Sequence, residues 1–97
     1  MIAIHRYVIR VADKVVLEIP GLSRLLDIGH RRSDSPGELQ VWALVDTDSP
    51  KMHRQPLVIR GTGHPVDEAC GDVSRTYWKT VQAGMLVWHI FKLGSSS

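Results

Sequence analysis

The sequence has one cysteine, Cys70, among its 97 residues, and it has no long hydrophobic run. A single cysteine excludes an internal disulfide framework and a cysteine-rich zinc site. The apolar stretches are only a few residues long, which excludes a transmembrane helix. His5 and Arg6 interrupt the first of them, so it lacks the continuous apolar core of a signal peptide. We therefore expect a cytoplasmic protein.

The sequence also lacks a large excess of charge of either sign. It has 12 Lys and Arg residues and 10 Asp and Glu residues, for a net charge of +2. This excess is too small for a general nucleic-acid binder, which needs many phosphate contacts. Hydrophobic residues make up 43% and charged residues 23%, which is typical of a folded protein. A chain of this length forms one domain. We assign residues 1–93 to that domain and residues 94–97 to a flexible tail.

Apolar and polar residues alternate with a period of two along much of the chain, which predicts strands. The runs are residues 2–11, 15–19, 39–45, 57–59, 76–81 and 86–93. We expect the first two runs to pair as a hairpin and the last two to pair around Gly84. Residues 22–28 fit a strand or a short helix, and Gly29 favours the strand. About seven strands predict an all-β fold, either a small antiparallel β-sandwich or a partly open barrel.

Two of the predicted strands, residues 39–45 and 86–93, have apolar side chains on both faces. In a two-layer domain, each sheet buries only one of its two faces. The long connections over residues 46–56 and 60–73 are rich in proline, glycine and charge, and we expect them to make poor covers. An open apolar surface with Trp42 or Trp88, together with Leu86 and Ile90, would follow. We therefore expect a homo-oligomer, most simply a dimer, that buries this surface.

No pattern in the sequence predicts a catalytic or metal site. The five histidines, at positions 5, 30, 53, 64 and 89, lack the close spacing of a local zinc motif. A serine nucleophile elbow is absent, and Cys70 lies in an acidic segment that disfavours a thiolate. His89 lies in an apolar strand, so we expect it in the core or at an interface with a ring nitrogen hydrogen-bonded. We predict a non-enzymatic protein with no cofactor and no metal.

The polar segment with the most information is residues 60–65, RGTGHP. Two glycines one residue apart after a strand let backbone N–H groups converge on an anion. Arg60 and His64 could add donors. The alternative is a tight turn that needs positive φ at both glycines. The candidate anion-binding residues are Arg31, Arg32, Arg60, Gly61, Thr62, Gly63 and His64, and the candidate protein-interface residues are Trp42, Tyr77, Trp78 and Trp88.

Three segments carry a resemblance to a known family, namely residues 42–46 (WALVD), 60–65 (RGTGHP) and 86–91 (LVWHIF). Together they resemble a family of small uncharacterised proteins of bacteriophages and prophages, over residues 39–91. Lys92 departs from that family, in which an acidic residue often ends the strand, and we interpret the change as a surface difference. The resemblance implies an accessory phage protein in the cytoplasm of an infected host cell, and it implies no catalytic residues.

These observations favour a binding module of the host-takeover or anti-defence type, which inhibits a host protein by direct interaction. One alternative is the capture of a small anionic or nucleotide-derived ligand. A second alternative is a minor structural component of the virion. We rank protein interaction first because the anion motif lacks the helix of a phosphate-binding loop.

Overall fold

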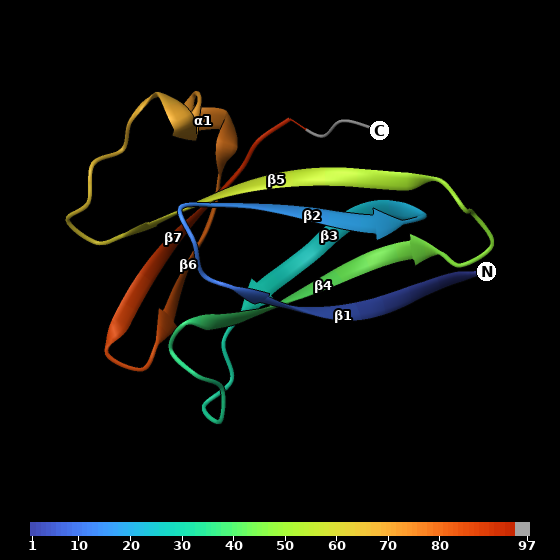
Figure 1. Ribbon diagram of the computed structural model, residues 1–97, viewed down its shortest axis with the longest axis horizontal. Coiled ribbons are helices and arrows are strands. Elements are labelled where there is room, and N and C mark those ends of the chain that lie inside the picture. Colours follow the sequence, from blue (N-terminus) through green and yellow to red (C-terminus); the bar gives the residue numbers. More distant parts are fainter. Residues whose placement is uncertain (95–97) are drawn as a thin grey trace.

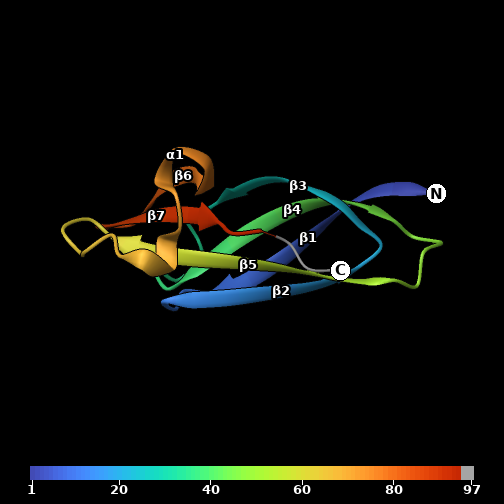
Figure 2. The ribbon, with the colours of Figure 1, turned by 90° about the horizontal axis from the view of Figure 1, so that it is seen from above.

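The computed structural model describes residues 1–94 as two antiparallel β-sheets packed face to face (Figures 1 and 2). The strands are β1 (Ile2–Arg10), β2 (Lys14–Pro20), β3 (Leu22–Gly29), β4 (Glu38–Asp46), β5 (Met52–Gly61), β6 (Tyr77–Ala83) and β7 (Leu86–Lys92). The three-stranded sheet has the order β1-β4-β3, and the four-stranded sheet has the order β2-β5-β7-β6. The prediction of an all-β fold is confirmed, as an open sandwich. The predicted flexible tail lies, beyond Gly94, outside the described residues.

The predicted alternation decides which side chains fill the space between the sheets. Along β4, the central strand of its sheet, Leu39, Val41, Ala43 and Val45 are fully buried. The neighbouring strands of the same sheet and the strands of the facing sheet contribute the rest of the main core: Ile9, Leu17, Ile19, Leu25, Ile28, Leu57, Ile59, Val81, Ala83 and Ile90. Within residues 1–94, no helix is long and apolar enough to cross a membrane.

The ambiguous segment, residues 22–28, is a strand, as expected. β3 pairs with β4 but shifts register twice, between Leu22 and Arg24 and between Leu25 and Asp27. Each bulge adds one residue, so the inward side chains of Leu25 and Ile28 are three residues apart instead of two. This spacing explains why the sequence also fits a short helix.

The first two strands do not form the predicted hairpin, because they lie in opposite sheets. β1 pairs with β4, whereas β2 pairs with β5. A strand with one apolar face can bury that face by stacking on its neighbour in sequence as well as by pairing beside it. The period of two therefore indicates which face is buried, but it does not identify the pairing partner. The predicted hairpin around Gly84, between β6 and β7, is present.

The chain crosses back from the four-stranded to the three-stranded sheet at Gly21. The Gly21 N–H donates to the carbonyl oxygen of Lys51, and the Gly21 carbonyl accepts from the Asp46 N–H, both at 2.8 Å. Gly21 has a φ of 69°, in the left-handed region that favours glycine. A Cβ atom at this position would lie 2.1 Å from the Asp46 carbonyl oxygen. Both the conformation and the close approach therefore require glycine.

β5 is longer than predicted, since it begins at Met52 and not at Leu57. The prediction of a long connection over residues 46–56 is wrong for this reason. Pro56 is tolerated inside the strand because a side chain replaces its missing donor. Its carbonyl accepts from the Leu93 N–H at 3.1 Å, so its nitrogen also faces β7, just beyond the last paired residues of that ladder, Leu57 and Lys92. The Leu93 carbonyl, which would accept from an N–H at position 56, instead accepts from Nε2 of Gln55 at 2.7 Å.

The second long connection, residues 62–76, covers the outer face of the four-stranded sheet. It contains a 3₁₀ helix, η1 (Glu68–Cys70), and one short α-helix, α1 (Val73–Thr76). Cys70 is fully buried against Val58 and Phe91 on that outer face. The prediction that this connection makes a poor cover is therefore wrong, and the second apolar face of β7 is partly covered within one chain.

The open surface predicted for a dimer is also absent. Ile90 is fully buried between the sheets. Trp88 is half-buried, and its Nε1 donates to the Pro36 carbonyl at 3.1 Å. Trp42 lies on the outer face of the other sheet, where Gly29 leaves room for its indole ring, 3.6 Å from the position of a Cβ. These side chains therefore do not form one surface, and the dimer itself stays a prediction.

The contact at Gly21 gives a stability prediction. We expect Gly21→Ala to lower the free energy of unfolding by at least about 3 kcal/mol, because it combines positive φ with steric overlap. Gly63 is a matched control, since it has a φ of 90° but no atom within 4 Å of its Cβ position. Gly63→Ala should cost only the conformational part, about 1–2 kcal/mol. Urea unfolding measures both, and equal losses would show that the overlap at Gly21 is not important.

An ion pair between the two sheets gives a pH prediction. Lys79 on β6 donates to the Asp27 carboxylate on β3, and this hydrogen bond, with that of the Ile28 N–H, lowers the pKa of Asp27 below its ordinary value. A lowered pKa stabilises the fold above the ordinary pKa of about 4, and this contribution is lost as the pH falls through the lower, folded-state value. We expect the melting temperature to fall below about pH 4, and Asp27→Asn to reduce that fall. Identical pH profiles for the two proteins would contradict this assignment.

Candidate functional site

The chain leaves β5 in a tight turn over residues 61–64. The His64 N–H donates to the Gly61 carbonyl at 3.0 Å. Gly63 has positive φ but Gly61 does not, so the turn needs a left-handed residue at one glycine only. At Gly61 a Cβ would lie 3.0 Å from Nδ1 of His64, a close contact with an exposed side chain that can shift.

This turn forms one wall of a pocket of about 300 Å³ on the outer face of the four-stranded sheet. The pocket is lined by Arg60, Gly61, Thr62, Gly63, His64, Val66, Val73, Tyr77, His89 and Phe91. The structure therefore brings together five of the seven candidate anion-binding residues. The surface of the pocket is mostly apolar. The rings of Tyr77 and Phe91 meet edge to face within it, with their centroids 5.9 Å apart.

Arg60 uses its charge and its donors inside the protein. Its side chain is 12% exposed and forms an ion pair with Asp67, with Nη2 at 3.2 Å from the carboxylate. Its Nη1 donates to the carbonyl oxygens of Asp13 and Ile59, at 3.1 and 3.0 Å. The same Asp67 carboxylate accepts from the Ala69 N–H at the start of η1. Arg60 therefore ties the 62–76 connection to β5 and to the turn before β2.

A chain of hydrogen bonds crosses the sheet beside the pocket. The hydroxyl oxygens of Thr62 and Thr80 lie 2.8 and 2.9 Å from Nε2 and Nδ1 of His89. The Thr80 hydroxyl also bonds to the Tyr77 hydroxyl. Both ring nitrogens of His89 are therefore engaged, and the histidine connects β5, β6 and β7. Within the described residues, no group of three or more His, Cys, Asp or Glu side chains could hold a metal ion.

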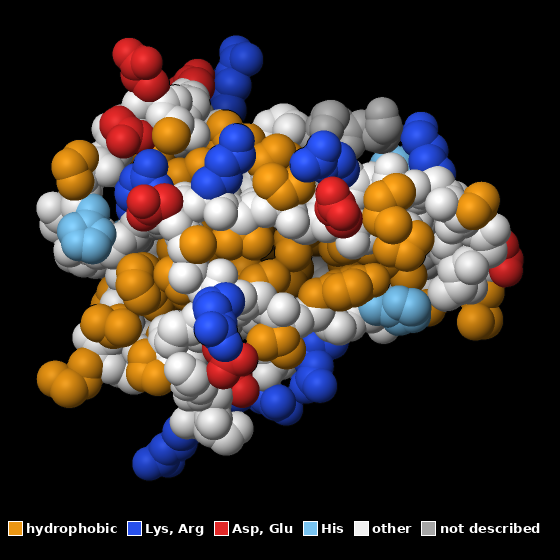
Figure 3. All heavy atoms as spheres, in the orientation of Figure 1, with side chains coloured by type: hydrophobic (Ala, Val, Ile, Leu, Met, Phe, Trp, Pro, Cys, Tyr) orange, Lys and Arg blue, Asp and Glu red, His pale blue; other side chains and the backbone are white. Residues whose placement is uncertain are grey.

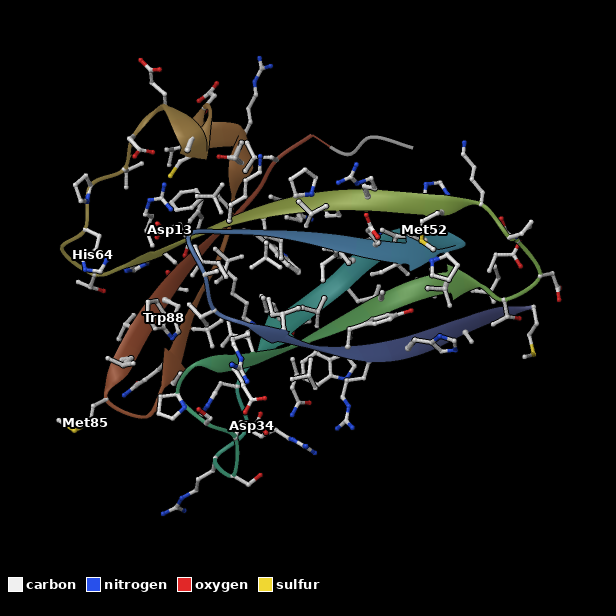
Figure 4. The ribbon with its side chains drawn as sticks, in the orientation of Figure 1. Asp13, Asp34, Met52, His64, Met85 and Trp88 are labelled. Carbon is white, nitrogen blue, oxygen red and sulfur yellow. The ribbon has the colours of Figure 1, made fainter. Side chains whose placement is uncertain are left out.

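A second pocket, of about 250 Å³, lies on the other side of the same turn, and it is lined by Gly61, Thr62, His64, Met85, Leu86, Val87 and Trp88. In Figure 4, His64 and Met85 occupy the two tips of this end of the molecule, with Trp88 between them. Figure 3 shows hydrophobic side chains gathered along the same end. We use the name turn-end surface for the two pockets and the exposed apolar residues around them, Val66, Val73, Tyr77, Met85 and Leu86.

The other candidate anion-binding residues lie elsewhere. Arg31 and Arg32 are in the loop between β3 and β4 and are exposed. Arg31 forms an ion pair with Asp34, with 3.8 Å between Nε and the carboxylate. Arg32 lines a separate pocket that shares no residue with the turn-end surface. The seven candidate residues therefore do not form one site.

The aromatic candidates are also dispersed. Tyr77 and Trp88 line the pockets of the turn-end surface, whereas Trp42 is on the other sheet. Trp78 is half-buried, and the Lys92 ammonium lies 4.7 Å from the centre of its ring. Partial burial lowers the pKa of Lys92. Lys92 therefore packs against an aromatic ring while it stays partly exposed, and its interpretation as a surface difference stays a prediction.

Sequence reasoning missed four residues of the first pocket: Val66, Val73, His89 and Phe91. The period of two places His89 and Phe91 on the same face of β7, which is a usable signal. The position of Val66 and Val73 depends on how the 62–76 connection folds back. No local pattern in the sequence predicts how this connection folds back over the sheet.

These features define a small β-sandwich domain with a mostly apolar double pocket at one end. The chain belongs to the family DUF7352, a domain of unknown function, whose profile matches residues 1–97. No curated protein and no solved structure matches the chain. The comparisons do not address a bacteriophage origin, which stays a prediction.

The contacts of Arg60 predict a structural effect of its removal. We expect Arg60→Ala to lower the free energy of unfolding by about 1–3 kcal/mol, because two carbonyl groups and Asp67 lose their partner. Arg54 is a matched control, since it is 57% exposed and pairs with Glu18 on the surface. Arg54→Ala should cost less than about 0.5 kcal/mol. Denaturant unfolding measures both, and an unchanged stability of Arg60→Ala would make Arg60 available for a ligand.

Proposed function

We propose that the protein is a non-enzymatic binding module that holds a protein partner on its turn-end surface. The observation that carries this proposal is the pair of pockets on either side of the 61–64 turn, bordered by exposed apolar side chains. Met85 is 99% exposed and Val66 is 55% exposed, although both are large and apolar. Clusters of this kind, with pockets for anchor side chains, are typical of protein interfaces.

The chemistry of the first pocket favours an apolar anchor over an anion. An anion needs donors or positive charge that the protein does not already use. Arg60 is neutralised by Asp67, and both nitrogens of His89 are bonded to threonines. Phe91, Tyr77, Val66 and Val73 present carbon to the pocket instead. A space of about 300 Å³ is at the lower end of the range for ligand pockets, and its apolar lining suits an aromatic or aliphatic side chain of a partner.

The resemblance to bacteriophage proteins supports a particular setting for this interaction. In that setting, the partner is a host protein in the cytoplasm of the infected cell, and binding inhibits it. The capture of a small anionic ligand is the competing function, which the experiment below separates from the proposed one.

The test is an affinity capture from a lysate of the cell in which the protein occurs, with mass spectrometry of proteins and of released small molecules. We compare the wild type with Val66→Asp and Leu86→Asp, which place a charge beside each pocket. Val16→Asp is the matched control, because Val16 is an exposed valine at the far edge of the four-stranded sheet. We expect a stoichiometric protein that the wild type and the control retain.

The purified partner should then bind each pocket variant at least about tenfold more weakly than the wild type, since a charge at an anchor site costs more than 1.4 kcal/mol. Titration calorimetry measures this difference. A partner that binds all four proteins equally would place the interface elsewhere. A released nucleotide without any protein partner would support ligand capture instead.

A further inference from the structure

The free edge of β1 presents the backbone groups of its even-numbered residues. The Met1 carbonyl accepts from the Thr47 N–H, and the Val11 N–H donates to the Gly37 carbonyl, so odd-numbered residues face β4. The N–H and C=O groups of the even-numbered residues therefore point away from the sheet. These residues are Ile2, Ile4, Arg6, Val8 and Arg10. β4 is the only strand that pairs with β1 within residues 1–94, and Figure 1 shows no strand beyond it near the N-terminus.

The other three edge strands carry a bulge or a proline, whereas β1 carries neither and has only Arg6 and Arg10 as charges on its free edge. β3 has two register shifts and β6 has one. The Ile59 N–H donates to the Asp13 carbonyl, which places Lys14, Val16, Glu18 and Pro20 on the free edge of β2. Bulges, charges and proline are the common protections of an edge. β1 pairs without a register shift over all nine residues, and it contains no proline.

Three of the five outward side chains of β1 are apolar and exposed to an unusual degree. Ile2, Ile4 and Val8 are 59%, 61% and 56% exposed, on the same face as half-buried Trp42 and Leu44 of β4. An exposed, regular and apolar edge tends to be paired in the native assembly, since it otherwise promotes aggregation.

We propose that β1 pairs antiparallel with β1 of a second copy, around a two-fold axis at His5. The apolar pattern is self-complementary in this register, because Ile2 lies opposite Val8 of the second copy and Ile4 lies opposite the aliphatic part of Arg6. Each of these pairs exchanges two backbone hydrogen bonds, which is the arrangement that the outward even-numbered groups require. The two three-stranded sheets then form one continuous sheet. This dimer does not depend on the turn-end surface.

The first test compares molecular masses by light scattering behind a sizing column at high micromolar concentration. We expect the wild type near twice the chain mass of 10.9 kDa. Ile4→Lys should weaken the dimer at least about tenfold, because a lysine at the free edge opposes strand pairing. Val16→Lys, on the free edge of β2, is the matched control and should remain dimeric. Thermal melting checks that both variants are folded, and a monomeric wild type would overturn the proposal.

The second test examines the register. Residues at the two-fold axis form a non-hydrogen-bonded pair, whose Cα atoms are about 4.5 Å apart, within the range of a disulfide. Native Cys70 is fully buried. Mild oxidation should therefore cross-link His5→Cys into a covalent dimer, while Glu18→Cys on β2 stays unlinked. A dimer that Ile4→Lys leaves intact, or that His5→Cys does not cross-link, would place the interface elsewhere.

Discussion

The arrangement of the two sheets depends on the crossing at Gly21. Two backbone hydrogen bonds join this residue to Asp46 and Lys51, which flank the turn between β4 and β5. That turn connects the central strand of the three-stranded sheet to an inner strand of the other sheet. Two of the three changes of sheet, from β2 to β3 and from β4 to β5, therefore meet at one point, at the end of the molecule opposite the turn-end surface (Figure 1). Backbone hydrogen bonds therefore join the two crossings at this end, and the loops that carry the pockets lie at the opposite end.

The 62–76 connection packs over the four-stranded sheet and also lines the first pocket. Cys70 fills the space over Val58 and Phe91, and the pairing of Arg60 with Asp67 holds the connection against the sheet. The same placement brings Val66 beside the pocket. A residue that sequence reasoning assigns to anion binding is thus part of the support of an apolar site. This is a general consequence of small domains, in which one loop often has to complete the core and form the binding surface.

Local alternation was enough to predict the all-β class and the buried faces of the regular strands, because a half-buried strand imposes a period of two. It did not predict the buried face of β3, whose bulges place Leu25 and Ile28 inward. It was not enough to predict pairing, as the separation of β1 from β2 shows, since stacking and pairing leave the same pattern. The ends of β5 were missed because a proline such as Pro56 normally ends a strand. Pro56 is tolerated here because it faces β7 at the end of the β5–β7 ladder, where the Gln55 side chain replaces its donor, and the sequence does not show where that ladder ends. Turn residues 61–64 were singled out from the sequence, and they do line the pocket. Their apolar surroundings come from segments that fold back over the sheet, and tertiary contacts determine how these segments fold.

The distance in sequence between β1 and its partner β4 also affects how the chain folds during synthesis on the ribosome. β1 is synthesised first, yet its pairing with β4 begins with Arg10 opposite Glu38 and ends with Ile2 opposite Asp46. At about 5–20 residues per second, the partner strand follows a few seconds later. During that interval the apolar alternation of β1 has no sheet to join, whereas the β6–β7 hairpin can close as soon as it emerges. Newly made β1 therefore waits for its partner strand with an unpaired apolar face, and so does β2, whose partner β5 is synthesised after β4.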